Sequence, residues 1–162
     1  MSKKSAIIWK IIWLEALLMV FYTANGAFVT ITEPSGPLLQ FAVLIPLAAG
    51  IFVYLLWKNK WRDAFFERTI TFNVQTFLLW SPLLLVLVVM LIGNRGLNFD
   101  SMPDLIFMFI MQLFVVAFIE ETFFRGFMLK ALLAKGVFKA VLITSILFGV
   151  THSLQLLGGQ SM

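Results

Sequence analysis

Hydrophobic residues fill long continuous runs of this chain, and charged residues gather in the short segments between the runs. A helix needs roughly 20 apolar residues to cross the hydrocarbon core of a bilayer, so runs of this length are typical of membrane-spanning helices. The pattern predicts five such helices, at about residues 6–32, 38–57, 72–92, 105–129 and 137–157. Because the runs do not alternate between apolar and polar residues, helices are favoured over the strands of a membrane barrel.

Composition strengthens this interpretation. The chain of 162 residues is 61% hydrophobic and 12% charged, with a mean hydropathy of +0.99, whereas a soluble domain is about 45–50% apolar and about 25% charged. We therefore expect one all-α membrane domain over residues 1–162, folded as a polytopic helix bundle. The net charge is only +4 and no basic patch is evident, so nucleic acid is excluded as a main partner. The absence of cysteine excludes a disulfide scaffold and a cysteine nucleophile.

The basic residues predict the orientation in the cell membrane. Ten of the twelve lie on alternate connections: Lys3, Lys4, Lys10, Lys58, Lys60, Arg62, Arg68, Lys130, Lys135 and Lys139. Such connections face the cytoplasm, which places the N-terminus inside and the C-terminus of this chain outside. A cleaved signal peptide ending near residues 24–26 is the alternative for the first helix, but its apolar run continues past that point.

Aromatic residues near the predicted span ends are interpreted as interfacial anchors. They are Trp9, Trp13, Tyr22, Tyr54, Trp57 and Trp61. The first span also carries Lys10 and Glu15 in its opening turns, and no role is assigned to them.

Three charged residues lie within six positions of the fourth span, namely Glu120, Glu121 and Arg125. Placing a charge in the membrane costs about 2.5–3.5 kcal/mol, so such residues suggest a functional site. Glu121 and Arg125 are four apart and are expected to pair along the helix, which in the plainer alternative only stabilises the helix. Glu120 points about 100° away from Glu121 and is left without this partner. A buried, unpaired carboxylate is a candidate general base.

The fifth span carries His152, which is predicted to lie at the depth of Glu120. Glu120 is about 15 Å along its helix from Lys130, and His152 is about 20 Å from Lys139, at 1.5 Å per residue. The polar residues of the fifth span share an arc around Phe148: Thr144, Ser145, Thr151, His152 and Gln155. Such a stripe must face protein or water rather than lipid, although interhelical hydrogen bonding alone is an alternative for these residues.

Together these residues resemble the motifs of the CPBP intramembrane proteases, named for CAAX-processing and bacteriocin-processing members and also called the Abi family. The first family motif, E-E-x-x-x-R, is similar to residues Glu120–Arg125, and the second, F-x-x-x-H, is similar to Phe148–His152. The resemblance covers about residues 100–157. It implies an endopeptidase that cuts a peptide or protein substrate within or beside the bilayer.

The resemblance also implies roles for the motif residues. Glu120 would activate water as the general base, His152 would help to position that water, and Glu121 with Arg125 would hold the helix geometry. The family is often called a metalloprotease, which makes Glu120, Glu121 and His152 candidate zinc ligands. Catalytic zinc usually takes three protein ligands from suitable directions, and adjacent glutamates on one helix diverge. The cofactor therefore stays unassigned, and a mechanism with water alone is favoured.

A third family motif, H-x-x-x-N, has no counterpart, because His152 is the only histidine and the sequence given ends at Met162. We expect the chain to lack the last one to three helices of the family. Two alternatives to proteolysis follow: a bacteriocin self-immunity or interaction protein without catalysis, and an inactive truncated remnant. The sequence does not identify the substrate.

Overall fold

The computed structural model describes residues 3–61, 85, 88, 92 and 102–157. Every regular element within these residues is helical, which confirms the all-α prediction. The elements are α1 (Lys3–Thr32), η1 (Leu39–Phe41), α2 (Leu44–Trp57), α5 (Met102–Met111), η4 (Gln112–Val116), α6 (Ala117–Glu120), η5 (Glu121–Leu129), α7 (Lys130–Leu132), η6 (Leu133–Lys135) and α8 (Val137–Leu157). The elements from α5 to η6 form one continuous helix, Met102–Lys135, so the described residues form four main helices. We call Met102–Lys135 the long helix.

The predicted spans agree with these helices to different degrees. The first and fifth match α1 and α8, with small differences at the start of α1. The second begins later than expected, because residues 39–41 form a 3₁₀ turn before α2. The fourth is longer than expected and runs on to Gly136, whose φ of 99° favours glycine and ends the helix. The third predicted span lies outside the described residues, apart from helical positions 85, 88 and 92.

Two helices are long and apolar enough to cross a membrane: Ser5–Thr32, of 28 residues, and Met102–Lys135, of 34 residues. Leu44–Trp57 and Val137–Ser153 are apolar but shorter. Large hydrophobic side chains face outward on all four helices, among them Trp13, Phe109 and Phe138. Exposed apolar surface on this scale suggests contact with lipid rather than water.

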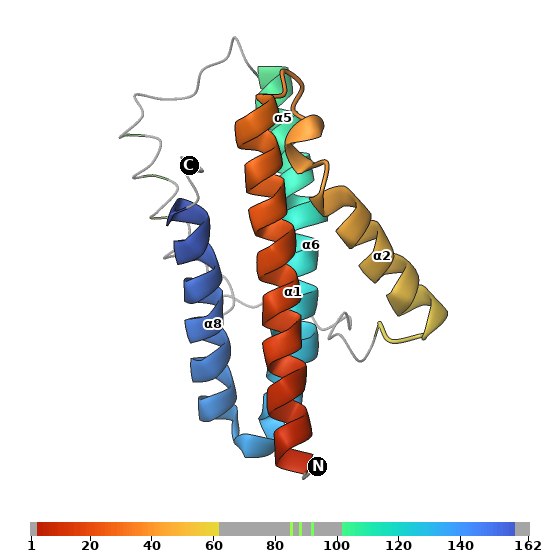
Figure 1. Cartoon of the computed structure of the whole chain (residues 1–162), viewed down its shortest axis with the longest axis vertical. Coiled ribbons are helices and arrows are strands. Elements are labelled where there is room, and N and C mark those ends of the chain that lie inside the picture. Colours follow the sequence, from red (N-terminus) through yellow and green to blue (C-terminus); the bar gives the residue numbers. More distant parts are fainter. Residues whose placement is uncertain (1–2, 62–84, 86–87, 89–91, 93–101, 158–162) are drawn as a thin grey trace.

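Helix α1 runs through the middle of the arrangement, with the long helix and α8 beside it and α2 inclined away (Figure 1). Ile11, Leu132 and Ala140 form a small core where α1 begins, and Leu18, Ile119 and Met128 belong to the larger core farther along. α1 therefore runs antiparallel to the long helix and parallel to α8. This packing brings residues that are far apart in the sequence to the same level along the helix axes.

Two stretches of the long helix, η4 and η5, are π-helical. Such turns are rare and are often found at functional sites, because the wider turn changes the direction of the side chains that follow. Residues 121–125 of the first motif lie in η5, and Glu120 is the residue before it. The candidate site therefore begins where the helix changes its geometry.

Candidate active site

Three helices bring Tyr22, Glu120 and His152 together. The Tyr22 hydroxyl donates a hydrogen bond of 3.0 Å to Oε1 of Glu120, and the same oxygen lies 3.6 Å from Nε2 of His152. The Glu120 side chain is 18% exposed and that of His152 is 41% exposed. The carboxylate thus lies between a buried hydroxyl on one side and a half-buried imidazole on the other.

The packing of the neighbouring residues explains why Glu120 faces inward. Ile119 and Thr122 are fully buried, and the Thr122 hydroxyl donates to the carbonyl of Phe118 at 2.8 Å. The hydrogen bond back to the preceding turn satisfies a hydroxyl that has no water to bind. With these side chains in the core, Glu120 is directed towards the junction of α1 and α8.

The imidazole of His152 is held by its own helix and by a pair of aromatic rings. Its Nδ1 lies 3.0 Å from the carbonyl oxygen of Phe148. The centroids of the Phe148 ring and the His152 imidazole are 4.1 Å apart, and the two planes meet at an angle of 31°. Phe124 then packs edge-on against Phe148 at 5.1 Å. When Nδ1 carries the proton, it donates to this carbonyl and leaves the lone pair of Nε2 facing Glu120. The spacing F-x-x-x-H therefore places a ring and a carbonyl one turn before the histidine.

Glu121 and Arg125 form the predicted pair, with 3.1 Å between Oε1 and Nη1. Their side chains are 45% and 71% exposed, so the pair lies at the surface of the described residues rather than inside the bundle. Arg125 therefore engages Glu121 and not Glu120. This division of the two carboxylates agrees with the expectation from the helical spacing.

Tyr22 corrects two expectations. It was interpreted as an interfacial anchor, but it is only 7% exposed and lies in the core beside the candidate site. Glu120 was expected to have no partner, but the Tyr22 hydroxyl donates a hydrogen bond to it. Nothing local in the sequence around Tyr22 signals this contact, because it depends on how α1 packs against the long helix.

Glu15 is a second carboxylate of the first span that the sequence left without a role. It is 7% exposed and Thr151 is 2% exposed, and the Thr151 hydroxyl donates to Oε1 of Glu15 at 2.5 Å. Its other oxygen, Oε2, makes no hydrogen bond with any described residue. The contact ties α1 to the residue just before His152, so α1 supports the candidate site at two points.

The polar stripe of α8 is divided between the core and a pocket. Thr144 is buried and donates to the carbonyl of Ala140 at 2.9 Å, whereas Ser145 is exposed. The side chain of Gln155 lies outside the described residues. A pocket of about 290 Å³ lies between the long helix and α8, lined by Ala117, Glu120, Glu121, Phe124, Arg125, Thr144, Ser145 and Phe148. Both carboxylates of the first motif therefore border a space with polar and aromatic walls.

The donor set does not fit a catalytic zinc ion. Glu121 is engaged by Arg125, which leaves Glu120 and His152 as the nearby charged and imidazole donors. Among the described residues, no group of three or more His, Cys, Asp or Glu side chains is arranged to hold a metal ion. Because catalytic zinc usually has three protein ligands, no step is assigned to a metal.

The structure thus combines apolar helices with a contact between Glu120 and His152. A known family of peptidases matches the segment that carries both residues. Residues 102–161 match the family model described as Rce1-like, Type II CAAX prenyl endopeptidase Rce1-like. The matched segment carries both motifs, and the match confirms the resemblance inferred from them. No curated protein matches the chain, and no solved structure matches it.

Proposed function

We propose that the protein is an intramembrane endopeptidase of the CPBP type that hydrolyses peptide bonds beside or within the bilayer, with Glu120 as the general base. The observation that carries the proposal is the contact of Glu120 with both Tyr22 and His152. Glu120 also borders the pocket between the long helix and α8. The family match over residues 102–161 supports a peptide or protein as the substrate.

The proposed reaction needs one water molecule and one peptide bond. Glu120 removes a proton from the water, whose oxygen attacks the carbonyl carbon to give a tetrahedral intermediate. When the C–N bond breaks, the nitrogen takes a proton from Glu120 and leaves as an amine, so the carboxylate is regenerated. His152 orients the water from the other side through Nε2, which lies 3.6 Å from Oε1 of Glu120.

The remaining residues have positioning roles in this proposal. The hydrogen bond from Tyr22 fixes the rotamer of Glu120, and Phe148 fixes the imidazole plane of His152. Glu121 and Arg125 stabilise η5, the element that begins directly after Glu120 and contains the rest of the first motif.

The proposed topology has five spans, with the N-terminus in the cytoplasm and the end of this chain outside. The parallel course of α1 and α8 and the antiparallel course of the long helix support it (Figure 1). Lys60, just after α2, lies in one pocket with Lys10 and Lys130, whereas α5 begins at the opposite end of the bundle (Figure 1). The chain between Trp61 and Met102 thus joins the two ends, which supports a third crossing.

Substitution of Glu120 by Gln in the membrane-embedded chain tests the proposal, with cleavage of a prenylated CAAX reporter peptide as the measurement. Gln keeps the shape of the side chain but is not a base, so kcat is expected to fall by about 10²–10⁴-fold. Glu33→Gln is the control, because Glu33 is an exposed carboxylate on the loop after α1 and its loss should leave cleavage unchanged.

His152→Ala should be comparably damaging, and its effect should not add to that of Glu120→Gln, because residues that act on one water behave as a unit. Full cleavage by the Glu120→Gln variant would remove the base from the proposed mechanism. A binding or interaction role that survives this substitution would then be the better description.

A further inference from the structure

The first helix carries a buried carboxylate that the proposed reaction does not use. Glu15 is 7% exposed, and its Oε2 makes no hydrogen bond with any described residue. A buried polar atom without a partner has lost its hydration and gained nothing in return, so it destabilises the folded chain. The presence of Glu15 in the core therefore needs an explanation other than the stability of the bundle.

The hydroxyl that binds Glu15 does not depend on it. The Thr151 hydroxyl has one proton and two acceptors within reach, Oε1 of Glu15 at 2.5 Å and the carbonyl oxygen of Leu147 at 3.1 Å. The carbonyl oxygen alone would satisfy this donor, because the buried hydroxyl of Thr144 bonds to carbonyl oxygens of its own helix in the same way. The contact with Glu15 is thus an additional link, and it joins α8 to α1.

This link controls the rotation of α8 about its own axis. Successive residues of a helix point about 100° apart, so His152 is turned away from α1 when Thr151 faces α1. This direction brings Nε2 of His152 to 3.6 Å from Oε1 of Glu120. The contacts of the imidazole with Phe148 lie within α8 and turn with it. The rotation of α8 relative to α1 must be fixed from outside α8, and Glu15 does this.

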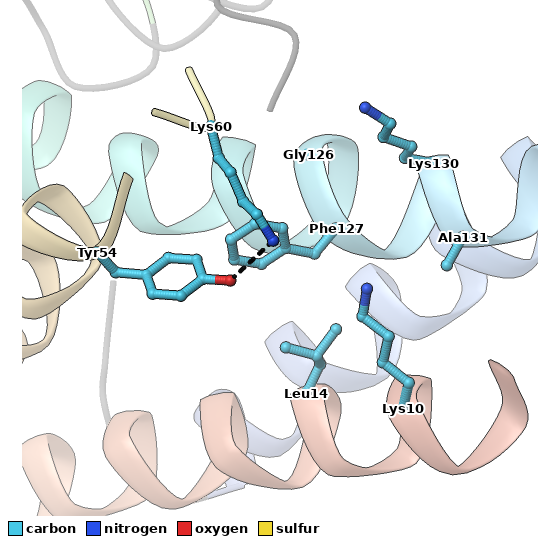
Figure 2. Close-up of a pocket in the computed structure, with 8 residues that line it drawn as sticks. All are labelled: Lys10, Leu14, Tyr54, Lys60, Gly126, Phe127, Lys130 and Ala131. Atoms are coloured by element: carbon cyan, nitrogen blue, oxygen red, sulfur yellow. Dashed lines mark hydrogen bonds between the residues drawn. The ribbon is translucent and has the colours of Figure 1, made fainter. Parts of the chain in front are cut away.

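Helix α1 is a suitable reference for this rotation, because several contacts hold its own orientation. Its buried residues recur at intervals of four and three positions and therefore share one face: Ile11, Glu15, Leu18, Tyr22 and Asn25. On this face, Tyr22 binds Glu120. Figure 2 shows Leu14, the residue before Glu15, directed from α1 towards Phe127 of the long helix. One helix thus meets both the long helix and α8.

We propose that Glu15 is a positioning residue of the candidate active site, which holds α8 through Thr151 so that His152 faces Glu120. The inference rests on the proposed function, in which His152 orients the water beside Glu120. Tyr22 would then hold the base and Glu15 would hold the histidine, from positions two turns apart on one face of α1. Helix α1 lies outside the segment that matches the Rce1-like model, so these contacts add to the roles of the two motifs.

Glu15→Leu and Thr151→Val test the contact from its two sides, with the CAAX reporter peptide as substrate. In each variant kcat should fall by about 10- to 100-fold while KM changes little, because a small displacement of a group that acts on the reaction is sufficient for such a loss. The double variant should lose no more than either single variant, since both remove the same contact. Glu15→Gln keeps an oxygen that accepts from Thr151 and should recover most of the loss.

Ser153→Ala is the matched control. Ser153 flanks His152 on the other side, and its exposed hydroxyl bonds to the carbonyl oxygen of Gly149 within α8. Its loss removes a hydroxyl beside the histidine without breaking a described contact with α1. This variant should therefore keep the kcat of the unaltered chain.

Two further readouts separate positioning from a merely structural role. His152 is the only histidine of the chain, so its imidazole gives one set of nitrogen NMR signals. Glu15→Leu and Thr151→Val should shift and broaden these signals, because the ring then samples several positions, whereas Glu15→Gln and Ser153→Ala should leave them in place. The Tm of Glu15→Leu should equal or exceed that of the unaltered chain, since the substitution removes an unpaired buried atom.

The outcomes distinguish this proposal from the proposed function. Unchanged imidazole signals in Thr151→Val would overturn the positioning role. A lower Tm of Glu15→Leu, or its failure to insert, would also overturn it, because Glu15 would then serve stability. If the unaltered chain does not cleave the reporter, the proposed function fails, and the imidazole signals still decide whether Glu15 holds His152 in place.

Discussion

Tyr22 and Glu120 share a hydrogen bond, but we expect substitution of Tyr22 to reduce kcat less than substitution of Glu120. Tyr22→Phe removes one hydroxyl and leaves the ring in the core, where Tyr22 is 7% exposed. A hydrogen bond to a charged group contributes about 1.5–3 kcal/mol, and its loss here would let the carboxylate of Glu120 turn away from the water. We expect kcat for the reporter peptide to fall by about tenfold or more while KM changes little.

Tyr54→Phe is the matched control for this prediction. Tyr54 also bears a hydroxyl with a charged neighbour, Lys60, but it lines a separate pocket beside Phe127 and not the candidate active site. Cleavage should be unaffected in this variant. An unchanged kcat in Tyr22→Phe would show that the contact only stabilises the packing of α1.

At the scale of the element, η5 carries an ion pair at its surface. The 3.1 Å contact between Glu121 and Arg125 should make their substitutions non-additive, because either residue alone leaves an unpaired charge in a membrane-spanning helix. We expect Glu121→Gln/Arg125→Gln to be more stable than the sum of the single variants implies, by about 0.5–3 kcal/mol in the free energy of unfolding.

Steric trapping in bicelles measures this free energy for a membrane protein. The combination Glu33→Gln/Arg125→Gln is the control, because Glu33 is exposed after α1 and its substitution should add independently to that of Arg125. If both combinations are additive, the pair contributes nothing to η5.

The sequence predicted this element in part. The spacing of Glu121 and Arg125 was sufficient to predict their contact, because four residues along a helix bring two side chains together whatever surrounds them. The π-helical geometry of η5 was not predicted. Phe123, Phe124 and Met128 lie in the core, but an apolar pattern alone does not distinguish an α-helical from a π-helical turn. The 3₁₀ turn before α2 was missed because the run from Leu38 to Val43, apolar apart from Gln40, does not distinguish one helical form from another.

For the whole molecule, the proposed topology predicts which positions react with a membrane-impermeant thiol reagent. The chain has no cysteine, so single cysteines can be introduced without a background. Positions 34–36 and 95–101 should react in intact cells, and positions 60–66 and 134–138 should react only after permeabilisation, because basic connections stay in the cytoplasm.

A cysteine at position 33 or 34 and one at position 136 provide a matched pair, because one lies after α1 and the other between the long helix and α8. The reverse labelling pattern would invert the orientation and place the N-terminus outside the cell. Labelling of positions 95–101 and 60–66 from the same side would contradict a third crossing.

The sequence by itself determined the properties that depend on neighbouring residues: the helical class, the approximate ends of α1 and α8, the contact between Glu121 and Arg125, and the two motifs of the segment that matches the Rce1-like model. The tertiary structure decided which residues of different helices meet. Tyr22 meets Glu120 across 98 positions and Glu15 meets Thr151 across 136 positions. Helical periodicity fixes side chains only relative to their own axis, whereas the contacts between axes depend on how buried surfaces such as those of Leu18 and Ile119 pack together.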